Sequence, residues 1–244
     1  MANWSDPRSN AAMRATSVGT GAAAYDAGLR SYMLSVYNYM ASGVLLTGIV
    51  ALLFANSSAA PAILFGPSPL KYLIMFSPLA FVMVLSFGIN RLSTTAAQAL
   101  FWVFAVAMGL SMASIFFVYT GTSIAQTLFA SAAGFAGLSL YGYTTKRDLS
   151  GFGTFMVMGV FGLLIAMLIN IFLQSSALQL VISFLGVLLF AGLTAYDTQR
   201  IKSLYFHIAG TDMVGKTAVM GALSLYLDFI NMFMFLLQFM GNRR

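Results

Sequence analysis

The sequence contains no cysteine, no glutamate, a single histidine and few charged residues of either sign. The lack of cysteine excludes disulfides, thiolate metal sites and cysteine nucleophiles. The one histidine, His207, lies in a polar stretch, so zinc-dependent and serine-type proteolysis have no support. Charged residues make up 7% of the chain, against about 25% in soluble domains. So low a share of charged residues indicates a membrane protein and not a soluble domain.

The chain instead has long apolar stretches. Hydrophobic residues make up 60% of its 244 positions, and the mean hydropathy is +0.88. This composition predicts an all-α integral membrane protein, so the lipid bilayer is an expected partner. The net charge of +6 is scattered singly or in pairs between apolar blocks, so it does not indicate a nucleic-acid partner.

Charged residues divide the apolar sequence into candidate spans, because about 20 apolar residues cross a bilayer as a helix. Two segments carry no charge over 54 and 48 positions, which is too long for one crossing and predicts two helices in each. We expect these segments to break near Thr120–Ser123 and near Gln174–Ser176. The seven predicted spans are one at 32–55, one between Lys71 and Arg91, two within 92–145, two within 149–196 and one at 219–240.

The remaining segments are polar. Residues 1–21 are small and polar and are predicted to form a flexible amino-terminal tail, ahead of a membrane domain over 22–244. Residues 22–31 are expected to form a short helix at the membrane interface. The stretch Thr198–Lys216 is expected to be a polar link between the last two spans.

Basic residues predict the orientation of the chain in the membrane. With the amino terminus in the cytosol, nine basic residues fall on the inner side and three on the outer side, which agrees with the positive-inside rule. The inner set is Arg8, Arg14, Arg30, Arg91, Lys146, Arg147, Arg200, Lys202 and Lys216, and the outer set is Lys71, Arg243 and Arg244.

The last predicted span contains one charged residue, Asp228, at its middle. A carboxylate at that depth costs at least a few kcal/mol on insertion scales, so it should face protein or water rather than lipid. Gly221, Ser224 and Asn231 lie on the same helical stripe as Asp228. We therefore expect this helix to be central in the bundle, with Asp228 as its functional centre.

Two further residues complete a candidate site with Asp228. Asp197 lies near the inner end of the sixth span, one turn beyond Thr194, and Arg91 lies at the inner end of the second. Asp228 is about 15 Å deeper than Lys216 if the last helix is regular, so tilt or unwinding must bring the two aspartates together. If they meet, they would share a proton and titrate as a pair, with Arg91 as a latch.

The ligands around such a pair suit a permeating cation better than a stored one. Calcium takes six to eight oxygen ligands. The two aspartates, Ser224, Asn231 and Thr194 supply fewer, which favours transient contact of a cation with Asp197 and Asp228. The site can therefore respond to pH and act as a gate.

Three segments carry a resemblance to a known family. The stretches SYMLSVYNYMASGVLLTG, FAGLTAYDTQRIK and GALSLYLDFINMFMFLLQ resemble the Bax inhibitor family, specifically its bacterial members. The resemblance implies a seven-helix bundle with a central last helix and a pH-sensitive calcium leak in a bacterial inner membrane. It places the family's paired aspartates on Asp197 and Asp228 and its partner arginine on Arg91. It implies no cofactor, with calcium as the permeating ion.

Other classes of protein fit the sequence less well. Intramembrane aspartyl proteases share the pair Tyr196–Asp197, but they need Gly-x-Gly before the second aspartate, where this chain has Leu225, Tyr226 and Leu227. A retinal protein needs a lysine inside a span, and none is present. A non-conducting regulator that binds another membrane protein, such as a protease or a chaperone, is the remaining alternative. No enzymatic activity is expected.

Overall fold

A computed structural model describes residues 7–244 of the chain, with side chains from Tyr25 onward. Within this range the chain is helical apart from turns and one isolated β-bridge. Seven helical segments are long and apolar enough to cross a membrane, which confirms the predicted all-α membrane architecture. The helices are α1 (Pro7–Ala55), α2 (Ala60–Leu64), α3 (Leu70–Gly88), α4 (Thr94–Met112), α5 (Ile115–Val118), α6 (Gly121–Thr144), α7 (Ser150–Leu173), α8 (Ser176–Ile208) and α9 (Met213–Met240).

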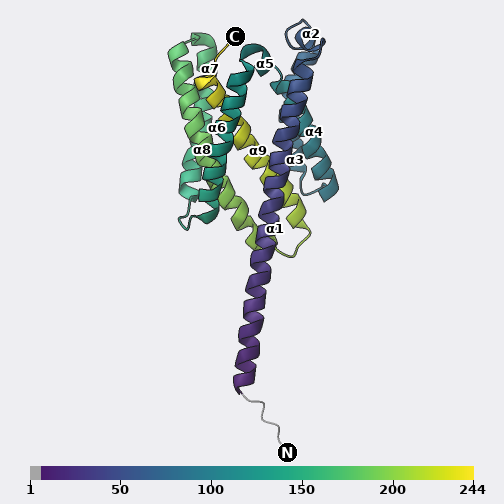
Figure 1. Ribbon diagram of the computed structural model, residues 1–244, viewed down its shortest axis with the longest axis vertical. Coiled ribbons are helices and arrows are strands. Elements are labelled where there is room, and N and C mark those ends of the chain that lie inside the picture. Colours follow the sequence, from purple (N-terminus) through teal and green to yellow (C-terminus); the bar gives the residue numbers. More distant parts are fainter. Residues whose placement is uncertain (1–6) are drawn as a thin grey trace, which may run out of the picture.

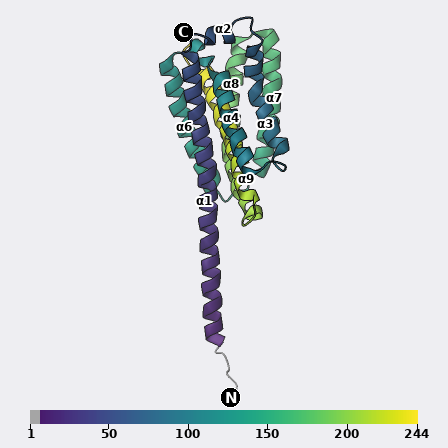
Figure 2. The same ribbon diagram turned by 90° about the vertical axis from the view of Figure 1, so that its right-hand side faces the viewer.

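The long helices run alternately up and down along one axis (Figure 1). The carboxyl terminus lies at the end of the bundle opposite to the start of α1, and α1 projects beyond the other helices at its amino-terminal end (Figure 2). The turn α3–α4, the loop α6–α7 and the turn α8–α9 share the end from which α1 projects. Which end faces the cytosol stays a prediction from the charge distribution.

The two long uncharged segments break where the sequence predicts, and polar caps explain why. Thr120 accepts a hydrogen bond from the Ser123 N–H (3.3 Å) at the start of α6. Ser175 accepts one from the Leu178 N–H (3.3 Å) at the start of α8. Such caps satisfy backbone donors that the first helical turn leaves free. Gln174 ends α7 in the left-handed conformation, with a φ of 49°.

Two predicted boundaries are wrong. The sixth spanning helix does not end near Thr198 but continues to Ile208, so the link to α9 is only a short turn. Polar residues such as Gln199 and Lys202 share this extension with Ile201 and Tyr205, which are buried, so the segment is an amphipathic helix. His207 lies in its last turn and is exposed.

Residues 22–31 also do not form the separate short helix that the sequence predicts. α1 runs without a break from Pro7 to Ala55, so residues 22–31 belong to the same helix as the first span. Residues 1–6 of the predicted tail lie outside the described residues. Flexibility of residues 1–21 stays a prediction.

α9 packs against α1, α4, α6 and α8 and is the most buried of the seven spanning helices. Its carboxyl-terminal end is held on the α5–α6 connection: the Thr120 N–H donates to the Asn242 carbonyl (3.1 Å), and the Asn242 N–H donates to Ser123 Oγ (2.9 Å). These contacts fix the register of α9 against its neighbours. Its central place in the membrane-embedded bundle stays a prediction.

α6 and α8 pack closely at Gly142. A Cβ atom at this position would fall on the carbonyl oxygen of Ala195, whereas a Cβ at Gly134 on the same helix meets nothing within 4 Å. We expect Gly142→Ala to lower stability by about 1–3 kcal/mol because the helices must separate. Gly134→Ala should be neutral or slightly stabilising, since alanine favours helix. Thermal unfolding in detergent measures both, and equal melting temperatures would contradict this packing.

Candidate functional site

Asp228 is buried at the middle of α9. Its side chain is 5% exposed, and its Oδ2 atom has no hydrogen-bond partner. Three nearby residues of α9 are buried as well: Leu225, Tyr226 and Phe229. A buried carboxyl oxygen without a donor is costly, more so when it is charged, and such groups in a membrane protein mark functional positions.

Asp197 lies on α8 at nearly the same height as Asp228. Asp197 comes eleven residues before the end of α8, and Asp228 comes fifteen residues after the start of α9. The helices are antiparallel neighbours, so the two differ by only about 6 Å along the axis. The gap expected from the sequence closes because α8 is longer than predicted, and no unwinding is needed. The Asp197 and Asp228 carboxyl groups are close enough for their charges to interact.

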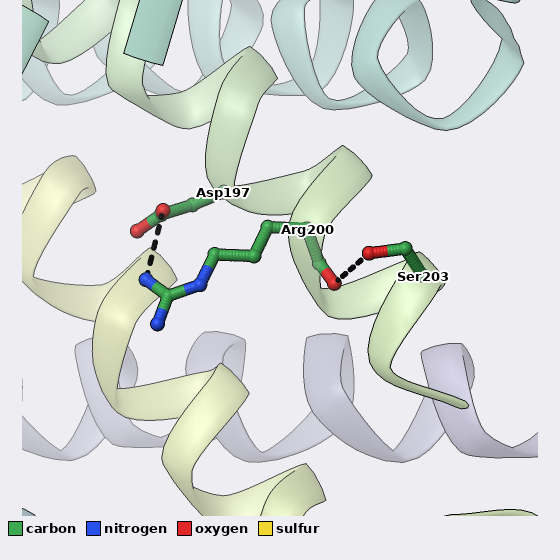
Figure 3. A network of polar contacts seen from close by, with 3 residues as sticks. All are labelled: Asp197, Arg200 and Ser203. Atoms are coloured by element: carbon green, nitrogen blue, oxygen red, sulfur yellow. Dashed lines mark hydrogen bonds and ion pairs between the residues drawn. The ribbon is translucent and has the colours of Figure 1, made fainter. Parts of the chain in front are cut away.

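The arginine beside Asp197 is Arg200, one turn along the same helix. Its Nη1 atom lies 4.0 Å from Asp197 Oδ1, and the Arg200 and Asp197 side chains are 59% and 15% exposed. Figure 3 shows the guanidinium folded back along α8 toward the carboxylate, while the Arg200 carbonyl accepts a hydrogen bond from Ser203 Oγ (2.8 Å). This pair is at the edge of the bundle and is accessible to water.

Arg91 does not take the place expected for it. It lies exposed in the turn between α3 and α4 and makes no ion pair with either aspartate. The arginine that lies within 4.0 Å of Asp197 is Arg200, at i+3 spacing on the same helix. Any role for Arg91 stays a prediction.

The three pathway candidates fall in different surroundings. Thr194 is fully buried and donates to the carbonyl of Phe190 (2.8 Å) in its own helix. Ser224 and Asn231 are partly exposed, and neither side chain makes a hydrogen bond within residues 25–244. Ser224 and Asn231 are therefore free to meet a water molecule or a cation, whereas the Thr194 donor is occupied.

α6 carries a row of hydroxyl groups that is not among the site residues predicted from the sequence. Ser123, Thr127, Ser131 and Ser139 are buried and follow a spacing of four residues, interrupted only at Phe135. Residues four apart lie on one helix face. Ser131 Oγ has no hydrogen-bond partner, so one member of this hydroxyl row is unsatisfied. The spacing is visible in the sequence, but serine and threonine are common in packed membrane helices and did not stand out.

The end of the hydroxyl row nearest the α6–α7 loop reaches the level of the aspartates. Ser139 Oγ lies 3.1 Å from Thr198 Oγ1, and Thr198 directly follows Asp197 on α8. Above this point, the ring of Phe135 packs edge-on against that of Phe229, with centroids 5.7 Å apart. Phe229 directly follows Asp228. The two phenylalanines therefore lie between Ser123, Thr127 and Ser131 and the level of the aspartates.

The opposite face of α9 is held by a polar clamp. Tyr226 is fully buried, and its hydroxyl lies 2.6 Å from Thr47 Oγ1, which also donates to the Ala105 carbonyl (2.8 Å). The clamp joins α9 to α1 and α4 two residues before Asp228. It fixes the rotation of α9 and hence the direction in which Asp228 points.

An apolar groove of about 670 Å³ lies between α1 and α6, over α9. Tyr37, Phe135 and Phe229 are among the residues that line it. Within the part of the chain that has described side chains, no group of three or more histidine, cysteine, aspartate or glutamate residues could hold a metal ion. Contact of a cation with the two aspartates stays a prediction.

Comparison with known proteins places these residues in context. A family model described as an inhibitor of apoptosis-promoting Bax1 matches residues 29–244. The chain is 48% identical to protein RP147 of Rickettsia prowazekii, over 90% of this chain and 93% of the relative. It is 44% identical to a protein of Caulobacter vibrioides, over 90% and 91%. It is 46% identical to the inner membrane protein YbhL of Escherichia coli, over 89% and 94%.

Proposed function

This chain belongs to the Bax inhibitor family, and from that membership and the site geometry we propose that it is a pH-controlled leak pathway for cations. Calcium is the ion that the family resemblance implies. The protein is an integral membrane protein, and its relative YbhL supports a bacterial inner membrane as its location. None of the relatives described above carries an enzyme name, and the proposed role is not enzymatic.

The observation that carries the proposal is the buried Asp228 carboxyl group, with an unpartnered Oδ2 and a second carboxyl group, Asp197, within electrostatic range. Two carboxyl groups in such surroundings hold one negative charge more cheaply than two. Arg200 stabilises the charge on Asp197. Asp228 is therefore the member of the pair that keeps a proton in this arrangement.

The direction of the pH response follows from this geometry. Loss of the proton would leave a buried charge on Asp228 with no donor at Oδ2. That charge is costly unless water or a cation reaches it. Raising the pH therefore favours an arrangement of α6, α8 and α9 that admits a cation to Asp228, and flux should increase from acidic to alkaline pH.

The α6 hydroxyl row supports a route to this site. Ser123, Thr127 and Ser131 lie between the end of the bundle that holds the carboxyl terminus and the level of Asp228. Hydroxyl oxygens can replace part of the hydration shell of a cation, and few ligands at each step allow it to leave. The Phe135–Phe229 contact closes this route in the arrangement described here.

Calcium flux into proteoliposomes that contain only this protein tests the proposal. We expect dye-reported influx to rise between about pH 5 and about pH 8, with protein-free vesicles as the control. Absence of flux at every pH would reject the leak and favour a non-conducting regulator that binds another membrane protein. A proton-flux measurement in the same vesicles identifies a coupled exchange of calcium for protons.

A further inference from the structure

A second cavity lies beside the aspartate pair, at the end of the bundle where α6 ends and α7 begins. It has a volume of about 310 Å³ and is formed by the α6–α7 loop together with α8. The cavity lies at the ends of helices that are long and apolar enough to span a membrane, next to the polar loop of residues 145–149. We call it the loop cavity; its lining residues are Lys146, Arg147, Asp148, Ser150, Tyr196, Gln199, Arg200 and Ser203.

The loop cavity has an excess of positive charge. Lys146, Arg147 and Arg200 face a single acidic residue, Asp148. The Ser150 hydroxyl and the Ser150 N–H (2.9 Å) hydrogen-bond to Asp148 and lower the pKa of its carboxyl group, so it is ionised at neutral pH. Neither Lys146 nor Arg147 makes an ion pair within the described part of the chain. Two cations are thus available to a ligand without breaking any contact.

The backbone of the loop is held in place before any ligand binds. The Gln199 side chain accepts a hydrogen bond from the Leu149 N–H (2.9 Å) and donates one to the Arg147 carbonyl (2.7 Å). This bridge fixes the loop on α8, from which Arg200 projects. A preorganised cavity loses less conformational entropy when a ligand binds.

We propose that the loop cavity binds a phosphate group, either that of an anionic phospholipid or free phosphate. Arginine guanidinium groups match the geometry of phosphate oxygens and form charge-assisted hydrogen bonds with them. Basic pockets near the ends of membrane helices bind lipid headgroups by the same chemistry. The position of the cavity beside the spans lets an acyl chain remain in the bilayer while its phosphate enters.

Arg200 links this cavity to the aspartate pair. It lines the loop cavity and also neighbours Asp197 at 4.0 Å, on the water-accessible edge of α8. A bound phosphate competes with Asp197 for the guanidinium and weakens the ion pair. This regulatory step, unlike the binding itself, rests on the proposed leak function.

Native mass spectrometry of the purified full chain in a neutral detergent tests the binding. We expect dioleoyl phosphatidic acid to bind saturably and dioleoyl phosphatidylcholine to bind far more weakly. Arg147→Gln and Arg200→Gln should each weaken phosphatidic acid binding about tenfold, as expected for loss of one charged hydrogen bond. Lys216→Gln removes the same charge at the same end of the bundle, outside the cavity, and should leave binding unchanged.

Competition with inorganic phosphate distinguishes the two sources of the ligand. Displacement of phosphatidic acid at millimolar phosphate supports free phosphate, and retention of the lipid supports a headgroup site. The proposal would be overturned if the wild type, Arg147→Gln and Arg200→Gln bound phosphatidic acid with equal affinity and also bound inorganic phosphate with equal affinity. Circular dichroism shows whether the variants are folded. Binding is measured without flux, so a failed leak assay does not affect it, and adding phosphatidic acid to the flux vesicles tests the regulatory step separately.

Discussion

Asp228→Asn should remove most of the pH dependence of calcium flux while the protein stays folded. Asparagine has nearly the volume of aspartate and can donate a hydrogen bond, so it suits the buried position better than an ionised carboxyl group does. It cannot lose a proton in this range. The event that we propose to drive opening, ionisation beside Asp197, is then absent at every pH. We expect flux in the variant to vary less than about twofold where the wild type varies about tenfold.

Asp212→Asn provides the matched control for this prediction. Asp212 is exposed just before α9 and makes no capping hydrogen bond with its side chain. The variant changes the net charge by the same amount, on the same segment, and should keep the wild-type pH profile. A wild-type pH profile in Asp228→Asn, measured in the same vesicles, would show that another group controls opening. The proposed gating by Asp228 would then be wrong, although the seven-helix fold would be unaffected.

The membrane spans could be predicted because they depend on a strong and local signal. Charged residues are excluded from the bilayer core, so long segments without charge mark spans. Where the two longest uncharged segments must divide into two helices, Thr120 and Ser175 cap the start of the second helix. The same signal does not show where a helix ends outside the bilayer. Beyond Thr198, the polar face of α8 can be solvated. Ile201 and Tyr205 are buried on its other face, and this packing keeps the segment helical.

The candidate site was only partly predictable, because a sequence shows which residues are unusual but not which are neighbours. Asp228 stands out as the one charge within its span. Arg200 was overlooked in favour of Arg91, although its spacing of three from Asp197 already allows a contact on one helix face. The Ser139–Thr198 contact joins α6 to α8 across 59 positions, and no local pattern predicts such a pair.

Phe135→Ala should produce a leak that no longer needs high pH. Phe135 occupies the one position at which the α6 hydroxyl row is interrupted, and its ring contacts that of Phe229, next to Asp228. Apolar constrictions of this kind block ions because water leaves them. Removing the ring connects Ser131 to Ser139 through a space that water can enter. We expect calcium flux at acidic pH to increase about tenfold, and to approach the wild-type flux at alkaline pH.

The control must separate this effect from simple loosening of the bundle, because a buried Phe→Ala change costs about 3–5 kcal/mol wherever it is made. Phe190→Ala removes a similarly buried ring from α8, where it stacks on Phe235 of α9 with centroids 5.8 Å apart. Phe190 is on α8 and is not part of the Phe135–Phe229 contact, so its loss should lower the melting temperature comparably without raising flux at acidic pH. If both variants leak equally, the Phe135–Phe229 contact is ordinary packing. If only Phe135→Ala leaks, the contact is the barrier between the hydroxyl row and the aspartates.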